Sequence, residues 1–101
     1  MTAGIFVGQI GVTIELETLD DAAILADATK KEIWYSVRSG SVTGKWSAEL
    51  SETKLVYTTT KITDLLIHGN WTLQAYVEGV GYKILGEKVI MPVGRPVLPI
   101  I

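Results

Sequence analysis

The feature that most constrains the fold of this chain is a two-residue alternation of apolar and polar side chains. It is clearest from Trp71 to Glu78, where every second residue from Trp71 to Val77 is apolar and the residues between them are polar or aromatic. Successive side chains of a strand point to opposite faces of a sheet. The segment therefore predicts a strand with one buried face.

The same alternation returns in other parts of the chain. We predict further strands at 10–16, 31–38 and 46–50, at 54–60, which is rich in β-branched and aromatic residues, and at 82–93, with a bulge or kink near Gly86. In the first of these, Ile10, Val12, Ile14 and Leu16 share one face. The stretch from Leu19 to Thr29 fits either a short helix or an acidic loop, and we assign it no regular structure.

Turn signals separate the predicted strands. Small polar residues and glycine occur at 39–44 and 51–53, and Gly79 and Gly81 flank Val80. Short strands with a turn every ~8–12 residues are typical of a β-sandwich or a small barrel. A chain of 101 residues has room for one such domain, of about seven strands.

Composition excludes several classes of partner and chemistry. The net charge is −2 and only Lys30 and Lys31 are adjacent among nine basic residues, which argues against nucleic acid as a partner. No apolar run is long enough for a transmembrane helix, and no basic segment precedes the first apolar stretch as in a secretory signal. We expect no membrane partner and synthesis in the cytoplasm. Without cysteine, stability must come from packing.

The residues that carry catalysis in enzymes do not form a recognisable set here. His68 is the single histidine, and Asp20, Asp21 and Asp27 do not have the spacing of a calcium-binding loop. Gly79 and Gly81 lie between two predicted strands rather than ahead of a helix, so they do not predict a phosphate-binding loop. We expect no catalytic residue, no metal site and no cofactor, and we predict that the chain is not an enzyme.

The tryptophans divide between two predicted environments. Trp46 and Trp71 share faces with aliphatic residues, which predicts that they belong to the core. Trp34 points away from the face that carries Ile33 and Tyr35. Trp34 is therefore the candidate for an exposed aromatic at a protein interface or at a glycan site.

The last eight residues differ from the rest. Residues 94–101 contain two of the three prolines, and proline cannot donate a hydrogen bond within a sheet. We predict a sandwich at 1–93 and an extended apolar arm at 94–101. The arm supplies further candidate interface residues, namely Val97, Leu98, Ile100 and Ile101.

The run from Asp64 to Glu78 resembles a signature of phage proteins related to the N-terminal domain of the baseplate upper protein. That signature has the form G-x-W-x-L-Q-A-Y-V after a tyrosine, threonines and Asp-Leu. The matching residues are Tyr57, Thr58, Thr59, Asp64, Leu65, Gly69, Trp71, Leu73, Gln74, Ala75, Tyr76 and Val77. The likeness extends over roughly 10–93, and it departs at 39–41, where such domains often have Pro-Asp-Gly or Pro-Asn-Gly.

The resemblance implies an immunoglobulin-like antiparallel β-sandwich that serves as a virion module. The expected function is a structural component of a tailed bacteriophage particle, in the tail, baseplate, head-to-tail connector or head decoration. Its partners would be other virion proteins, with the chain present as a homo-oligomer or in many copies. The alternative is a carbohydrate-binding or host-attachment module that uses Trp34 on an exposed sheet face.

Overall fold

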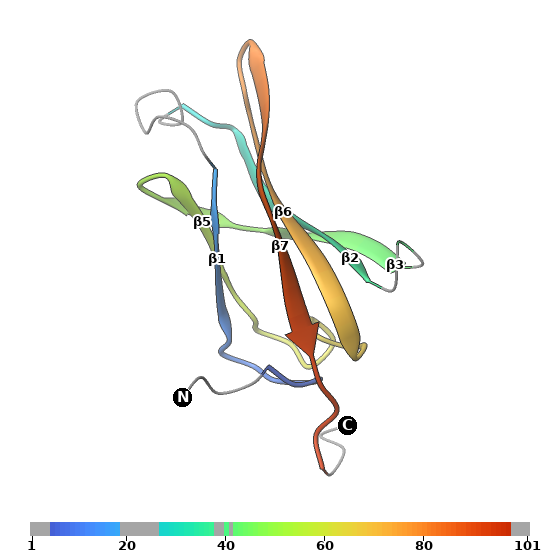
Figure 1. Ribbon diagram of the computed structural model, residues 1–101. Coiled ribbons are helices and arrows are strands. Elements are labelled where there is room, and N and C mark those ends of the chain that lie inside the picture. Colours follow the sequence, from blue (N-terminus) through green and yellow to red (C-terminus); the bar gives the residue numbers. More distant parts are fainter. Residues whose placement is uncertain (1–4, 19–26, 38–39, 41, 98–101) are drawn as a thin grey trace.

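The computed structural model describes residues 5–18, 27–37, 40 and 42–97, and every regular element among them is a β-strand (Figure 1). The sequence-based prediction of an all-β chain of about seven strands is confirmed. The predicted irregular stretch falls largely on 19–26, outside the described residues. The strands are β1 (Thr13–Glu17), β2 (Lys30–Val37), β3 (Val42–Ser47), β4 (Glu49–Ser51), β5 (Lys54–Thr58), β6 (Gly69–Gly79) and β7 (Tyr82–Val93).

The strands form two antiparallel sheets that pack into a sandwich. One sheet has the order β1-β5-β4 and the other the order β3-β2-β6-β7. If β1 to β7 are equated with strands B, C, C′, D, E, F and G, these are the sheets B-E-D and C′-C-F-G of an immunoglobulin-like sandwich. The hairpin of β6 and β7 reaches beyond the other strands at the top of Figure 1.

The space between the sheets is filled by the inward residues of the alternating segments. Aliphatic residues that are at most 2% exposed come from both sheets and from the β5–β6 connection: Leu16, Ile33, Val37, Leu55, Leu65, Leu73, Ala75 and Val77. Trp46 and Trp71 are 6% and 2% exposed, so their predicted place in the core is confirmed. Their rings stack at a centroid distance of 5.8 Å, and Trp46 also stacks on Tyr57 at 5.0 Å.

The predicted strand at 46–50 is in fact divided between the two sheets. β3 ends at Ser47 and pairs with β2, whereas β4 begins at Glu49 and pairs with β5. Between them the Ala48 amide donates to the Lys31 carbonyl at 2.9 Å. The alternation continues across this break because both sheets face the same core, which is why the sequence reads as one strand.

The predicted irregularity near Gly86 is a bulge in β7. Gln74 pairs with Lys88 and Tyr76 with Leu85, so three steps along β7 oppose two steps along β6. A Cβ atom on Gly86 would lie 2.7 Å from the Glu17 carbonyl oxygen. Glycine is needed here because the backbone of β1 approaches this close to the bulge.

The β5–β6 connection is organised by one carboxylate. Asp64 Oδ2 accepts hydrogen bonds from the Tyr57 hydroxyl at 2.7 Å and from the Thr60 and Lys61 amides at 2.9 and 3.1 Å. Burial acts to raise the pKa of Asp64, but these hydrogen bonds outweigh it and hold the pKa below its ordinary value. Burial, together with the hydrogen bond to Asp64, raises the pKa of Tyr57. The carboxylate therefore ties the connection to β5.

The segment before β1 departs from the predicted alternation. Ile10 is 58% exposed and does not share the buried face of Ile14 and Leu16, so this part of the prediction is wrong. The cause is Gly11, whose φ of 87° turns the chain out of the extended conformation before β1 begins. Further upstream, Val7 donates to the Gly94 carbonyl at 3.0 Å, which joins this segment to the end of β7.

Candidate functional site

The outer face of the four-stranded sheet, which points away from β1, β4 and β5, carries an ordered set of polar and aromatic side chains. Strand register places four of them side by side across the sheet: Lys45 pairs with Trp34, Trp34 with Gln74, and Gln74 with Lys88. A neighbouring row holds Thr43, Ser36, Thr72 and Ile90 in the same way. The two rows bring residues from four strands onto one surface.

Trp34 is the largest side chain of this surface and is held in one orientation. It is 37% exposed, and its ring stacks on Tyr76 with a centroid distance of 4.4 Å and an interplanar angle of 20°. Its indole nitrogen donates to Glu32 Oε1 at 3.1 Å. The ring is thereby fixed both by its neighbour on β6 and by a carboxylate two residues earlier on β2.

Glu32 connects the tryptophan to a lysine. It is only 9% exposed, and its Oε2 lies 3.2 Å from Lys45 Nζ. Burial acts to raise the pKa of Glu32, but the hydrogen bonds from Trp34 and Lys45 and the charges of Lys45 and Lys30 hold the pKa below its ordinary value. Glu32 therefore stays ionised at neutral pH and keeps both partners in place.

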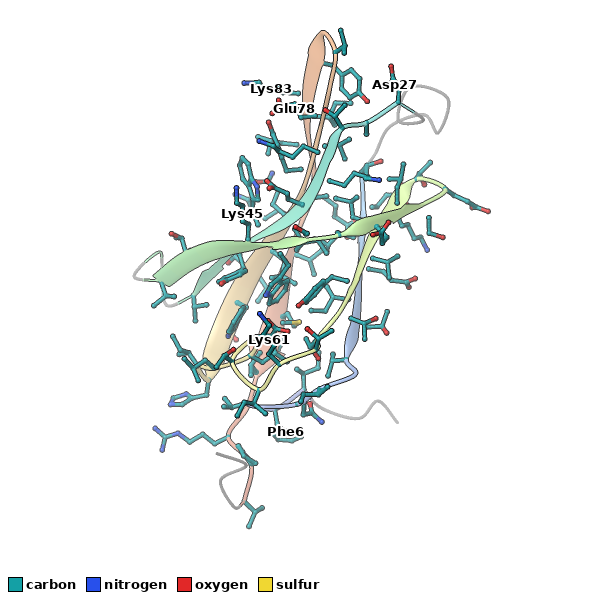
Figure 2. All side chains as sticks on the ribbon, turned by 180° about the vertical axis from the view of Figure 1, so that it is seen from behind. Phe6, Asp27, Lys45, Lys61, Glu78 and Lys83 are labelled. Atoms are coloured by element: carbon teal, nitrogen blue, oxygen red, sulfur yellow. The ribbon has the colours of Figure 1, made fainter. Side chains whose placement is uncertain are left out.

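The chain of contacts continues toward the tip of the β6–β7 hairpin. The Tyr76 hydroxyl donates to Glu78, which raises the pKa of Tyr76 to about 12, with burial as the lesser cause. The same hydrogen bond, with the charges of Lys30 and Lys83, holds the pKa of Glu78 below its ordinary value. Figure 2 shows Glu78 and Lys83 together near this tip, and Lys45 lower on the same side of the sheet.

Beside Trp34 the outer face is hollowed. The hollow has a volume of about 630 Å³ and is open to solvent. It is lined by Trp34, Tyr35, Ser36, Thr43, Gly44, Lys45, Thr72, Gln74 and Lys88. Tyr76 is not part of this lining, so the hollow lies on the side of the Trp34 ring that Tyr76 leaves uncovered.

Of the residues expected to form an interface, the structure describes Trp34 and Val97. Trp34 lies on the outer face, as its position in the alternation predicts. Val97 is fully exposed and follows β7, apart from the hollow. Leu98, Ile100 and Ile101 lie outside the described residues.

The other candidates for chemistry are dispersed. Asp27 accepts a hydrogen bond from the Tyr82 hydroxyl at 3.2 Å, whereas Asp20 and Asp21 lie outside the described residues. His68 is half-buried in the β5–β6 connection. Within the ranges that the structure describes, no three histidine, aspartate or glutamate side chains are grouped as metal ligands would be.

Sequence reasoning missed the residues that surround Trp34. Lys45, Gln74 and Lys88 are far apart in the sequence, and only strand pairing places them in one row. One signal was available, because the alternation from Trp71 to Glu78 puts Gln74 and Tyr76 on the face opposite the core. The alternation alone does not show that Gln74 and Tyr76 lie beside Trp34, because it does not say which strands pair or in which register.

Comparisons with protein-family models, with curated proteins and with solved structures find no match. Over the described part of the chain, no helix has the length and apolar character needed to cross a membrane.

Proposed function

We propose that this β-sandwich is a structural component of a tailed bacteriophage virion and acts through protein–protein assembly. The place in the particle would be the tail, the baseplate, the head-to-tail connector or the head decoration. The sequence resemblance from Asp64 to Glu78 favours a virion protein of this kind. The structural observation that supports assembly is a set of exposed aliphatic side chains on β7 and just beyond it.

β7 forms one edge of the four-stranded sheet. Leu85 and Ile90 project from it and are 55% and 65% exposed, and Val97, three residues after the bridge at Gly94, is fully exposed. Aliphatic side chains that gather along one edge gain about 25 cal/mol per Å² when a partner covers them. This gain favours a partner that packs along β7 and meets the segment 94–101.

The edge of β7 is poorly suited to pairing with a further strand. It is interrupted by the bulge at Gly86, it carries Lys83 and Lys88, and Pro92 has no amide hydrogen to donate. Bulges, lysines and proline are the features by which proteins prevent edge-to-edge pairing. Assembly would therefore proceed through the side chains of β7 rather than through its backbone.

The direct test is quantitative mass spectrometry of phage particles purified from cultures of the source strain. The proposal expects peptides of this chain at a fixed ratio to the major capsid protein. A ratio near one would indicate head decoration, and a small ratio would indicate a tail, baseplate or connector component. Absence from purified particles would overturn the proposal.

Two variants and one control test the surface itself. Ile90→Asp places a charge on the proposed contact and should lower incorporation by about tenfold or more, because burying an unpaired carboxylate is costly. Val80→Asp is the matched control, since Val80 is 87% exposed at the hairpin turn, away from the proposed contact.

A chain ending at Gly94 tests the contribution of the last residues. It should fold, because it keeps the backbone hydrogen bonds of Gly94 to Ile5 and Val7, and it should fail to incorporate. Equal incorporation of all variants would contradict assembly along β7.

A further inference from the structure

We propose that the hollow beside Trp34 is a binding site for an acidic saccharide, that is, an oligosaccharide whose rings carry carboxylate groups. The hollow lies across β3, β2, β6 and β7 on the outer face and borders the proposed assembly contacts, since Ile90 pairs with Thr72 on the same face. The two sites differ in their residues, because neither Leu85 nor Ile90 lines the hollow. Three observations support the inference: an aromatic ring with one face covered, a set of hydroxyl and amide groups, and two lysines among the lining residues, of which Lys45 is paired with Glu32 and Lys88 is not.

The aromatic wall is Trp34. Tyr76 covers one face of its ring, and the ring borders the hollow on the other side. Its only polar hydrogen is already donated to Glu32. The indole therefore offers the hollow an apolar ring face rather than a hydrogen-bonding edge, and such a face suits the C–H surface of a pyranose ring.

The floor of the hollow can bind hydroxyl groups. Ser36, Thr43 and Thr72 each carry a hydroxyl that can donate and accept, and Gln74 carries an amide with both functions. The Gln74 amide nitrogen lies 3.4 Å from the Gly86 carbonyl oxygen, a long contact that leaves the amide oxygen available as an acceptor. Alternating donors and acceptors next to an aromatic ring match the hydroxyls and the apolar face of a sugar.

The charge of the hollow specifies an acidic ligand. Lys45 and Lys88 stand at opposite ends of the row that contains Trp34 and Gln74. Lys45 is paired with Glu32 at 3.2 Å, whereas Lys88 forms no salt bridge with the described residues and no aspartate or glutamate among them lines the hollow. Lys88 therefore supplies the unpaired positive charge of the site. Three strand spacings separate the lysines, a span of roughly 14 Å, which exceeds one sugar ring and fits an oligosaccharide.

The site is also held in shape before any ligand arrives. Glu32 fixes both the Trp34 ring and the Lys45 ammonium group. Tyr76, which supports the far side of the ring, is itself anchored to Glu78. Because these side chains are already ordered in the free protein, binding does not have to bear the entropy cost of ordering them. A small and open site can therefore still hold a ligand.

The experiment is isothermal titration calorimetry of the purified chain with tetragalacturonate, compared with the neutral galactose tetrasaccharide. We expect binding of the acidic oligosaccharide that weakens as salt is raised, and at least about tenfold weaker binding of the neutral one. Trp34→Ala should lower the affinity for tetragalacturonate by about tenfold or more. Trp34→Phe, which keeps a ring face, should recover part of the loss.

Lys88→Gln and Lys83→Gln form a matched pair for the charge argument. Both lysines lie on β7 and are exposed, but only Lys88 lines the hollow. We expect Lys88→Gln to weaken binding severalfold and Lys83→Gln to leave it unchanged. Thermal unfolding of each variant verifies that the sandwich is intact.

Three outcomes would overturn the inference: no heat of binding at millimolar oligosaccharide, equal affinity for the acidic and neutral sugars, or equal effects of the two lysine substitutions. The purified chain is used without any particle. A failure here therefore leaves the proposed assembly role untouched, and absence from particles would leave this site untouched.

Discussion

The two faces of β2 show how one strand serves two purposes. Ile33 and Val37 face the other sheet and are completely buried, whereas Trp34, between them in sequence, is 37% exposed on the outer face. Ile33 is held by packing on every side, and Trp34 by one ring and one carboxylate. The alternation that builds the core therefore also places a second set of side chains, Trp34 among them, on the outer face.

The aromatic residues repeat this contrast. Inside, Trp46 and Trp71 stack in a cluster closed by Tyr35 and Tyr57. Outside, Trp34 is held by the Tyr76 ring and the Glu32 carboxylate, which are 8% and 9% exposed. The inner cluster should therefore determine stability and the outer one should determine binding.

The largest expected effect comes from breaking the inner cluster. Trp71→Ala removes a ring that is 2% exposed and also the hydrogen bond from its indole nitrogen to the Ile67 carbonyl at 2.8 Å. We expect the free energy of unfolding to fall by about 3–5 kcal/mol, because the cavity cannot fully collapse. Urea denaturation measures it, and a loss below about 1 kcal/mol would mean that the cluster is not the centre of the core.

A smaller loss of stability is expected from a substitution at the bulge in β7, which shifts the pairing of β7 with β6 by one residue. The extra residue lets Leu85 and Lys88 both point outward although they are three positions apart. Gly86→Ala would place a methyl group 2.7 Å from the Glu17 carbonyl oxygen and 2.8 Å from Thr18 Cα. We expect a loss of about 1–3 kcal/mol in urea denaturation. An unchanged midpoint would show that β1 and β7 are not in close contact.

Asp64 lies in the β5–β6 connection, outside both faces of β2, and its contribution to stability should depend on pH. Its folded-state pKa lies below the ordinary value, so its contribution to stability is present at neutral pH and is lost as pH falls through the folded pKa. Asp64→Asn should cost about 1–2 kcal/mol at pH 7. The difference from the unmodified chain should shrink below about pH 4. Urea denaturation from pH 7 to pH 3 measures it, and a pH-independent difference would contradict the role of the charge.

Much of the fold follows from the sequence, since burial imposes a period of two on every core strand. That period identified the inward positions of Ile33, Trp46 and Trp71, and the glycine in the last strand marked the bulge. It missed the passage of the chain between sheets at Ala48, because both sheets face one core. It also missed the turn at Gly11, where a positive φ rather than the hydrophobic pattern changes the direction of the chain.

The candidate site was only partly predictable. The outward position of Trp34 follows from its place in the alternation. Its neighbours Lys45, Gln74 and Lys88 do not, because cross-strand register depends on the packed structure.

Two adjacent residues on opposite faces of β2, Ile33 and Trp34, test this division between core and outer face most directly. Ile33→Ala and Trp34→Ala are each measured by urea denaturation under identical conditions. We predict that Ile33→Ala lowers the free energy of unfolding by about 2–5 kcal/mol. Trp34→Ala loses one ring stack and one hydrogen bond and should lower it by about 1–2 kcal/mol, less than Ile33→Ala despite removing the larger side chain. A loss at Trp34 equal to or larger than that at Ile33 would mean that the outer face is a structural surface rather than one available for binding.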